Sequence, residues 1–209
     1  MRVALLGGTF DPPHIGHLLV ASDAVDQLEL DRLVFIPASQ QPLKREQVSA
    51  PAAHRLRMVE LMTVGDRRFS VDEMEIRRTG LSFTVDTLEE YARRLPDAQR
   101  FFLLGADAFA TLDQWRDAAR VVELARLVVL TRMIDNGRHD PGTTPGLDEV
   151  TRRVRAIGGP GAAPPLTLAS RRIDVSSTEI RDRVATGRPI RGFVTDAVQQ
   201  YIETHGLYR

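Results

Sequence analysis

The chain has 209 residues and a formal net charge of zero, because 28 Lys and Arg side chains balance 28 Asp and Glu side chains. This length suits one α/β domain, and the lack of a basic excess argues against a general nucleic-acid binder. The absence of cysteine excludes disulfides and thiolate nucleophiles, and the absence of a signal peptide or a long apolar run predicts a cytoplasmic protein with no membrane partner.

The first predicted elements are a short apolar strand over residues 2–6, a glycine turn and a helix. The turn and the helix start read Gly7-Gly8-Thr9-Phe10-Asp11-Pro12-Pro13-His14-Ile15-Gly16-His17. Apolar side chains then recur at helical spacing, at Leu18, Ala21, Val25 and Leu28. In an open α/β sheet such a turn lies at the carboxyl end of a strand, where ligands bind.

The residue types of this turn suit a phosphate. Gly7 and Gly8 permit positive φ and close approach of a ligand, and the N–H groups at the helix start are anion donors. His14 and His17 share a face if the first turn is helical, and Gly16 between them leaves room for a ligand. Half of a zinc site is the alternative, but no third ligand stands out.

This turn resembles the signature of the nucleotidyltransferase superfamily, Gly-Thr-Phe-Asp-Pro-x-His-x-Gly-His. Class I aminoacyl-tRNA synthetases share the last four residues, but this chain is short and has no Lys-Met-Ser-Lys-Ser-like element. The resemblance implies a Rossmann-like open parallel sheet with helices on both faces, and ATP activated at its α-phosphate. It implies catalysis by His14 and His17, and ATP binding by Gly7, Gly8, Thr9, Phe10 and Gly16.

The next segments alternate between strands and helices, as a parallel sheet requires. Strands are expected over residues 32–37 and 69–77, the second with a break near its middle. The helix between them has an apolar stripe at Leu56, Val59 and Met62. We expect Arg55 and Arg57 on the solvent side of this helix.

Lys44 is the only lysine of the chain and lies in a polar loop over residues 38–50. On composition alone, a solvated loop charge and a phosphate contact are equally good interpretations. Bacterial nicotinate-nucleotide adenylyltransferases carry a Pro-x-His-Lys-like element here, and Pro42-Leu43-Lys44 resembles it without the His. The resemblance implies substrate binding by Lys44.

Thr84 begins a predicted helix, where it is a plausible N-cap. Spacing alone favours a simple capped helix. The segment Ser82-Phe83-Thr84-Val85-Asp86-Thr87-Leu88 also resembles the Ser-Tyr-Thr-x-Asp-Thr-Leu element of the nicotinate-nucleotide enzymes, with Phe83 in place of Tyr. That resemblance implies that Thr84 faces the pyridine ring of the substrate. The N-terminus of a helix stabilises a carboxylate, so this helix start favours nicotinate over nicotinamide as the substrate's ring.

A strand over residues 100–104 leads into Gly105-Ala106-Asp107, and Trp115 follows. Asp107 is either a helix cap or a ligand of a nucleotide's ribose or base, and Trp115 is either a core aromatic or a stacking ring. Gly-Ala-Asp-x-Phe-x-x-x-x-x-Trp resembles the same family. It implies nucleotide binding by Gly105 and Asp107 and substrate binding by Trp115. After the strand over residues 127–130, Arg132 alone matches the family's Arg-Pro-Gly, which implies a substrate contact.

The last third of the chain predicts an exposed loop over residues 136–146, a helix from 147, and strands over 166–168 and 173–175. A second helix start follows, in which Ser176 is a capping residue and Ser177, Thr178 and Arg181 share a face. Two hydroxyls and an Arg at a helix N-terminus suit a triphosphate. The segment resembles the superfamily's Ile-Ser-Ser-Thr-x-x-Arg, which implies ATP binding by Ser176, Ser177 and Thr178 and catalysis by Arg181.

Together these motifs predict one domain over residues 1–209, whose C-terminal helical part spans about 176–209. The resemblance implies adenylyl transfer from ATP to nicotinate mononucleotide, with Mg²⁺ bridging phosphate oxygens and Asp11 forming the turn. Phosphopantetheine adenylyltransferase and a non-catalytic adenine-nucleotide sensor are the alternatives. The expected partners are ATP and nicotinate mononucleotide, with a homo-oligomer left open.

Overall fold

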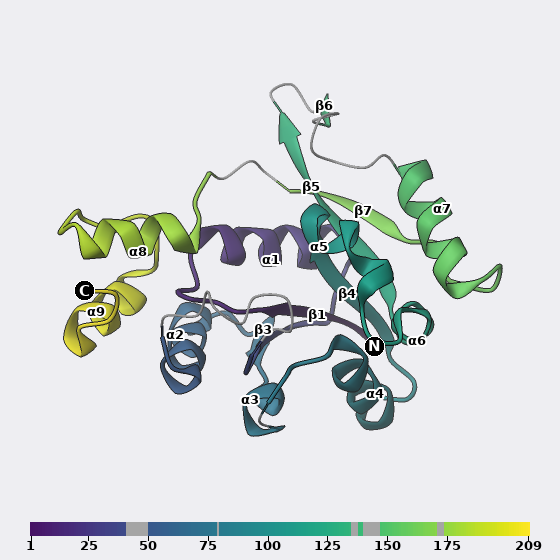
Figure 1. Ribbon diagram of the computed structural model, residues 1–209, viewed down its shortest axis with the longest axis horizontal. Helices are drawn as coiled ribbons and strands as arrows, with labels where there is room; N and C mark the ends of the chain where they lie inside the picture. Colours follow the sequence, from purple (N-terminus) through teal and green to yellow (C-terminus); the bar gives the residue numbers. More distant parts are fainter. Residues whose placement is uncertain (41–49, 79, 135–137, 140–146, 171–173) are drawn as a thin grey trace.

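A parallel β-sheet forms the centre of the computed structural model (Figure 1). The structure describes residues 1–40, 50–78, 80–134, 138–139, 147–170 and 174–209, and of residues 132–134, 138–139 and 170 it describes the backbone only. Within this part of the chain the parallel strands lie in the order β3 (Phe69–Val71), β2 (Arg32–Pro37), β1 (Arg2–Gly8), β4 (Gln99–Gly105), β5 (Arg126–Ile134) and β7 (Leu166–Ser170). The short strand β6 (Arg138–His139) pairs antiparallel with the end of β5.

Helices cover both faces of the sheet (Figure 1). One face carries α1 (Ile15–Gln27), α2 (Ala52–Thr63), α8 (Ser177–Ala185) and α9 (Asp196–His205). The other carries α3 (Met74–Arg78), α4 (Thr84–Arg94), α5 (Ala106–Ala110), the 3₁₀ helix η1 (Leu112–Gln114), α6 (Ala118–Leu124) and α7 (Leu147–Gly158). None of these helices is long and apolar enough to cross a membrane. The predicted α/β fold with a Rossmann-like sheet is confirmed.

The two cores follow from the alternation of side chains along each strand. In β1, Ala4 and Leu6 join the core that α1 and α2 cover, whereas Val3 and Leu5 join the core on the opposite face. Because helices cover both faces, every one of these positions is apolar. This is why the strand appears in the sequence as a continuous apolar run.

The strand order reverses between β1 and β4. The chain continues from β1 to β2 on one side and from β4 to β5 on the other. Because Leu6 pairs with Leu103, the two strands end at the same edge of the sheet, at Gly8 and Gly105. Ligands of open α/β sheets bind at such a switch point, outside the carboxyl ends of the strands. The predicted phosphate turn and the predicted nucleotide-binding turn therefore lie where this fold favours a ligand.

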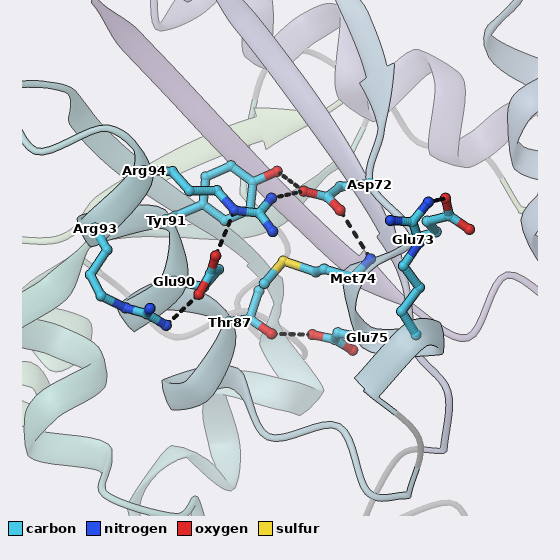
Figure 2. Close-up of polar contacts among 10 residues, drawn as sticks. Asp72, Glu73, Met74, Glu75, Thr87, Glu90, Tyr91, Arg93 and Arg94 are labelled. Atoms are coloured by element: carbon cyan, nitrogen blue, oxygen red, sulfur yellow. Dashed lines mark hydrogen bonds and ion pairs between the residues drawn. The ribbon is translucent and has the colours of Figure 1, made fainter.

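The predicted strand over residues 69–77 breaks near its middle, as expected, but its second half is the helix α3 and not a strand. Only the first three pair with β2. Asp72 then accepts a hydrogen bond from the backbone N–H of Met74 (2.9 Å), at the start of α3. The same carboxylate accepts hydrogen bonds from the Tyr91 hydroxyl (2.8 Å) and the Arg94 guanidinium (2.7 Å) of α4, as Figure 2 shows. These contacts of Asp72 thus turn the chain from β3 into α3 and override the strand pattern.

Three other boundaries also differ from the sequence prediction. Thr84 is the first helical residue of α4, and the N-cap is Phe83, whose backbone is extended. Asp174 and Val175 are not in a strand, and residues 171–173 lie outside the described part of the chain. The predicted loop over residues 136–146 contains the two residues of β6 and is otherwise outside the described part.

Candidate active site

The glycine turn after β1 is shaped by the ring of Phe10. Phe10 is buried and has a positive φ of 52°, whereas neither Gly7 nor Gly8 does. A Cβ atom at Gly8 would lie 2.8 Å from the Phe10 ring. The two glycines therefore do not use the positive φ that they permit, and Gly8 is needed because the aromatic ring folds back against it.

Phe10 also contacts His17, one of the predicted catalytic residues. Its ring lies edge-on to the His17 ring, with the centroids 4.9 Å apart, and edge-on to the Phe35 ring at 5.9 Å. Phe35 belongs to the core of β2. The position of the His17 ring is thus set by packing that reaches into the sheet.

His14 and His17 lie together, as their spacing predicted. Their ring centroids are 3.8 Å apart, and His14 is the N-cap of α1. The backbone N–H of His14 donates a hydrogen bond to Nδ1 of His17 (3.2 Å). Because this nitrogen accepts, the proton of the neutral His17 ring is on Nε2, which can donate to a ligand.

Burial keeps both rings neutral. It lowers the pKa of His14 to about 4. Burial, followed by the proximity of His14, lowers the pKa of His17 well below its ordinary value. Nδ1 of His14 is buried without a hydrogen-bond partner among the described residues. The pair is therefore a set of neutral hydrogen-bond donors and acceptors at neutral pH.

The start of α8 meets the start of α1. The Ser177 hydroxyl donates a hydrogen bond to the Pro12 carbonyl oxygen (2.8 Å). The Arg181 guanidinium donates to the Asp11 carbonyl oxygen (2.7 Å) and to Oγ1 of Thr178 (3.1 Å). The two helix starts, which are far apart in the sequence, therefore lie together.

Ser176 is the N-cap of α8, as predicted. Its hydroxyl accepts a hydrogen bond from the backbone N–H of Glu179 (3.1 Å). The remaining N–H groups of this first turn are available to an anion. The site therefore has two adjacent helix N-termini.

The turn after β4 is open to solvent. Gly105 is the N-cap of α5, and a Cβ atom added there would meet nothing within 4 Å. Asp107 is exposed in the first turn of α5. The Trp115 ring is half-buried and lies edge-on to Phe102 of β4 at 6.1 Å. Gly105 and Asp107 are therefore exposed at the end of β4, the strand that pairs with β1.

Arg116 connects the Trp115 segment to the start of α4. Its guanidinium lies over the Phe83 ring, 4.8 Å from the centroid, and 3.5 Å from the Asp86 carboxylate. Thr84 lies between these two partners in sequence and is half-buried. Two of the segments predicted to bind the acceptor substrate are thus adjacent.

Two predicted substrate residues are not placed. Lys44 lies outside the described part of the chain. Arg132 belongs to β5, of which only the backbone is described at this position.

Arg55 is buried rather than on the solvent side of α2, so that expectation is wrong. Its side chain donates to the carbonyl oxygens of Thr9 (2.7 Å), Ala38 (2.7 Å), Ser39 (2.9 Å) and Ala50 (3.1 Å). Burial lowers the pKa of the guanidinium, while the Asp11 carboxylate opposes this shift. A signal was present in the sequence, because position 55 shares the helical face of Met58, Val59 and Met62.

Tyr208 is a second residue that sequence reasoning missed. Its hydroxyl donates a hydrogen bond to Oδ1 of Asp11 (2.7 Å), and the backbone N–H of Ala50 donates to the same oxygen (3.1 Å). Burial and the Asp11 carboxylate raise the pKa of Tyr208 above its ordinary value. Asp11 is itself buried, and these contacts support its predicted role in forming the turn.

Comparison with known proteins identifies the family of this chain. The model of the cytidylyltransferase-like family matches residues 5–183. A protein of Gemmatimonas aurantiaca named probable nicotinate-nucleotide adenylyltransferase is 49% identical, over 100% of this chain and 93% of its own length. A protein of the same name from Thermus thermophilus is 41% identical over 100% of both chains.

Solved structures agree on the fold. Plasmodium falciparum nicotinic acid mononucleotide adenylyltransferase complexed with NaAD has a TM-score of 0.74 and 16% identity, covering 99% of this chain and 97% of that one. A putative nicotinate-nucleotide adenylyltransferase of Vibrio parahaemolyticus has a TM-score of 0.64 and 19% identity, covering 100% and 96%. The chain belongs to the cytidylyltransferase-like family and, within it, to the nicotinate-nucleotide adenylyltransferases.

Proposed function

We propose that this protein transfers the adenylyl group of ATP to nicotinate mononucleotide, giving nicotinate adenine dinucleotide and pyrophosphate in NAD biosynthesis. The observation that carries this proposal is the meeting of the starts of α1 and α8, both proposed to bind phosphate, near the switch point of the sheet. There the Ser177 hydroxyl donates to the Pro12 carbonyl oxygen (2.8 Å), and the His14 and His17 rings lie with their centroids 3.8 Å apart at the start of α1. Two helix N-termini at one place suit a polyphosphate.

In the reaction, a 5′-phosphate oxygen of nicotinate mononucleotide forms a bond to the α-phosphorus of ATP. The bond from that phosphorus to the bridging oxygen of the β-phosphate breaks, and the electron pair leaves with pyrophosphate. The attacking phosphate is already ionised near neutral pH, so no strong general base is needed. Catalysis then depends on positioning and on stabilisation of the charge that develops.

The two imidazoles supply part of that stabilisation. His17 is proposed to donate from Nε2 to an oxygen of the α- or β-phosphate, because its Nδ1 accepts from the His14 backbone. His14, whose ring centroid lies 3.8 Å from that of His17, is proposed to contact the same phosphates. Neutral donors stabilise a charge that increases during the reaction without binding the ground state too tightly.

The remaining ATP contacts are proposed around these rings. Ser177, Thr178 and Arg181 hold the β,γ end, together with the first turn of α8 that Ser176 caps. The other proposed ATP contacts come from the turns after β1 and β4, namely Gly7, Gly8, Thr9, Phe10, Gly16, Gly105 and Asp107. For the acceptor we propose Thr84 and Trp115, whose segments Arg116 joins, with Lys44 and Arg132.

Mg²⁺ is proposed as the companion of the ATP phosphates. Within the described residues no group of three or more His, Asp or Glu side chains is placed to hold a metal ion. The Asp11 carboxylate already accepts hydrogen bonds from Ala50 and Tyr208. Phosphate oxygens and water would therefore be the ligands, and the ion would supply charge neutralisation at the leaving pyrophosphate.

Labelled ATP tests the reaction that we propose. With nicotinate mononucleotide and Mg²⁺, label in the α-phosphate should appear in a dinucleotide, and label in the γ-phosphate should appear in pyrophosphate. Label from the γ-phosphate in inorganic phosphate would instead indicate hydrolysis. Tight ATP binding with no labelled product from any acceptor would favour a nucleotide sensor.

A further inference from the structure

We infer that Arg55 is a positioning residue. It fixes the position of the ATP side of the site relative to the acceptor side. The inference rests on the proposed function, because it concerns the alignment of two substrates. Arg55 is 1% exposed, and its guanidinium touches backbone from the ends of two adjacent strands. Its guanidinium is bonded to backbone carbonyl oxygens and is not proposed to contact the reacting atoms.

On the ATP side, Nη1 of Arg55 donates to the carbonyl oxygen of Thr9, which directly follows β1 (2.7 Å). Thr9 precedes Phe10, and the Phe10 ring packs edge-on against His17 at 4.9 Å. A shift of the Thr9 carbonyl therefore moves the ring against which His17 rests. Arg55 thus fixes one wall of the proposed α-phosphate position.

On the acceptor side, the same Nη1 donates to the Ala38 carbonyl oxygen (2.7 Å) and Nη2 donates to that of Ser39 (2.9 Å). The backbone N–H of Ser39 donates to Oγ of Ser82 (3.0 Å), and the backbone N–H of Ser82 donates to the Gln40 carbonyl oxygen (2.9 Å). Ser82 lies two residues before Thr84, the first residue of α4. A continuous set of hydrogen bonds therefore joins Arg55 to the segment proposed to face the pyridine ring.

Stability alone does not explain a guanidinium at this place. A buried cation loses its hydration, and an apolar side chain of similar volume often stabilises a core as well or better. Four backbone carbonyl oxygens in two directions, in contrast, match the planar fork of arginine and no other side chain. In-line transfer needs the attacking oxygen and the α-phosphorus aligned, and a small misplacement costs about 100-fold in rate.

Steady-state kinetics of Arg55→Met and Arg55→Lys test the inference, with Arg57→Met as the matched control. Arg57 lies on the same helix, is exposed and pairs with Glu60. We expect Arg55→Met to lower kcat about 100-fold while the KM for each substrate changes little. Lysine has three donors for four carbonyl oxygens, so Arg55→Lys should give an intermediate kcat. Arg57→Met should match the wild type.

Guanidinium rescue separates positioning from folding. Arg55→Ala should regain part of its kcat in dilute guanidinium chloride but not in sodium chloride of equal concentration. An effect on the fold alone would not be reversed by a denaturant. If the Arg55 variants do not fold, Ser82→Ala removes the hydroxyl that accepts from Ser39, and it should lower kcat at nearly unchanged Tm.

The inference would be overturned if folded Arg55→Met had a kcat close to that of the wild type. An unchanged kcat in Ser82→Ala would overturn it as well. Absence of turnover in the wild type would refute the proposed function instead. In that case amide hydrogen exchange decides the positional claim. The amides of Ala38 and Ser39 should exchange faster in Arg55→Lys than in Arg57→Met, and equal exchange would overturn it.

Discussion

The Ser177 hydroxyl donates a hydrogen bond to the carbonyl oxygen of Pro12 at 2.8 Å, and so joins two helix starts separated by 165 residues of sequence. Arg181 adds a second link, to the Asp11 carbonyl oxygen. In Figure 1, α8 lies beside α1 near one end of the sheet, and α9 lies next to α2. The proposed ATP site is therefore assembled from the two ends of the chain.

His17→Ala should lower kcat by roughly 10²–10³-fold, the loss typical for one donor to a developing oxyanion. The dissociation constant of ATP should change far less, because the contact strengthens in the transition state. Steady-state rates and calorimetric ATP binding measure the two effects. His205→Ala, at an exposed residue of α9, serves as the control. Unchanged turnover in His17→Ala would refute the role proposed for this ring.

Stability should fall as the pH is lowered from about 6.5 to about 4. Burial lowers the pKa of His14 to about 4, below its ordinary value of 6.5. In this pH window the unfolded chain therefore binds a proton that the folded chain does not, so acid favours unfolding. Urea unfolding of the wild type and of His14→Asn at several pH values measures this dependence. A slope as steep in His14→Asn as in the wild type would contradict it.

Gly8→Ala should affect stability, whereas Gly105→Ala should affect ATP binding. A Cβ atom at Gly8 would lie 2.8 Å from the Phe10 ring, so the alanine should displace that ring and destabilise the fold by about 1–3 kcal/mol. At Gly105 it would meet nothing within 4 Å, so stability should stay unchanged while the KM for ATP rises. Thermal unfolding and kinetics of both variants separate a packing glycine from a ligand-facing one. Equal Tm values for the two variants would contradict the assignment.

Tyr208→Phe should destabilise the protein by about 1–3 kcal/mol, because a buried carboxylate loses a hydrogen bond. The Tyr208 hydroxyl donates to Oδ1 of Asp11 at 2.7 Å. Chemical denaturation gives the free energy of unfolding, and Arg209→Ala, at an exposed neighbour, is the control. If both variants unfold at the wild-type midpoint, the hydrogen bond is not important for the turn.

Trp115 is the only tryptophan, so its fluorescence should report binding of the acceptor. The ring is half-buried and is proposed to stack on the pyridine, which should quench the emission. Nicotinate mononucleotide should therefore quench the wild type, and Trp115→Phe should raise the KM for this substrate more than that for ATP. Emission that responds to ATP alone would assign the ring to the adenine instead.

The sheet and the phosphate turn could be predicted from the sequence because their signals are local. The apolar run over residues 2–6 and the adjacent glycines lie within one strand and one turn, so the placement of His14 and His17 followed directly. The burial of Arg55 was missed because a charged side chain is normally expected to be exposed to solvent. Its burial becomes favourable only through hydrogen bonds to carbonyl oxygens of three segments that are separate in the sequence. Tyr208 was missed because its partner, Asp11, is 197 residues away in sequence.

The strand predicted over residues 69–77 shows the same limitation. Its alternating apolar residues suit a strand, but the Asp72 carboxylate accepts from the N–H of Met74 at the start of α3 and from Tyr91 and Arg94 of a later helix. Figure 2 shows these contacts beside a second link between α3 and α4, the hydrogen bond from the Thr87 hydroxyl to the Glu75 carboxylate. Tertiary contacts of this kind override a local pattern and cannot be read from spacing.

Pyrophosphate release from MgATP, measured with nicotinate mononucleotide, nicotinamide mononucleotide and phosphopantetheine in turn, tests adenylyl transfer most directly. We expect rapid release with nicotinate mononucleotide and much slower release with the other two. Turnover with phosphopantetheine alone would keep the chemistry but contradict the substrate. Tight ATP binding with no pyrophosphate from any of the three would contradict adenylyl transfer itself.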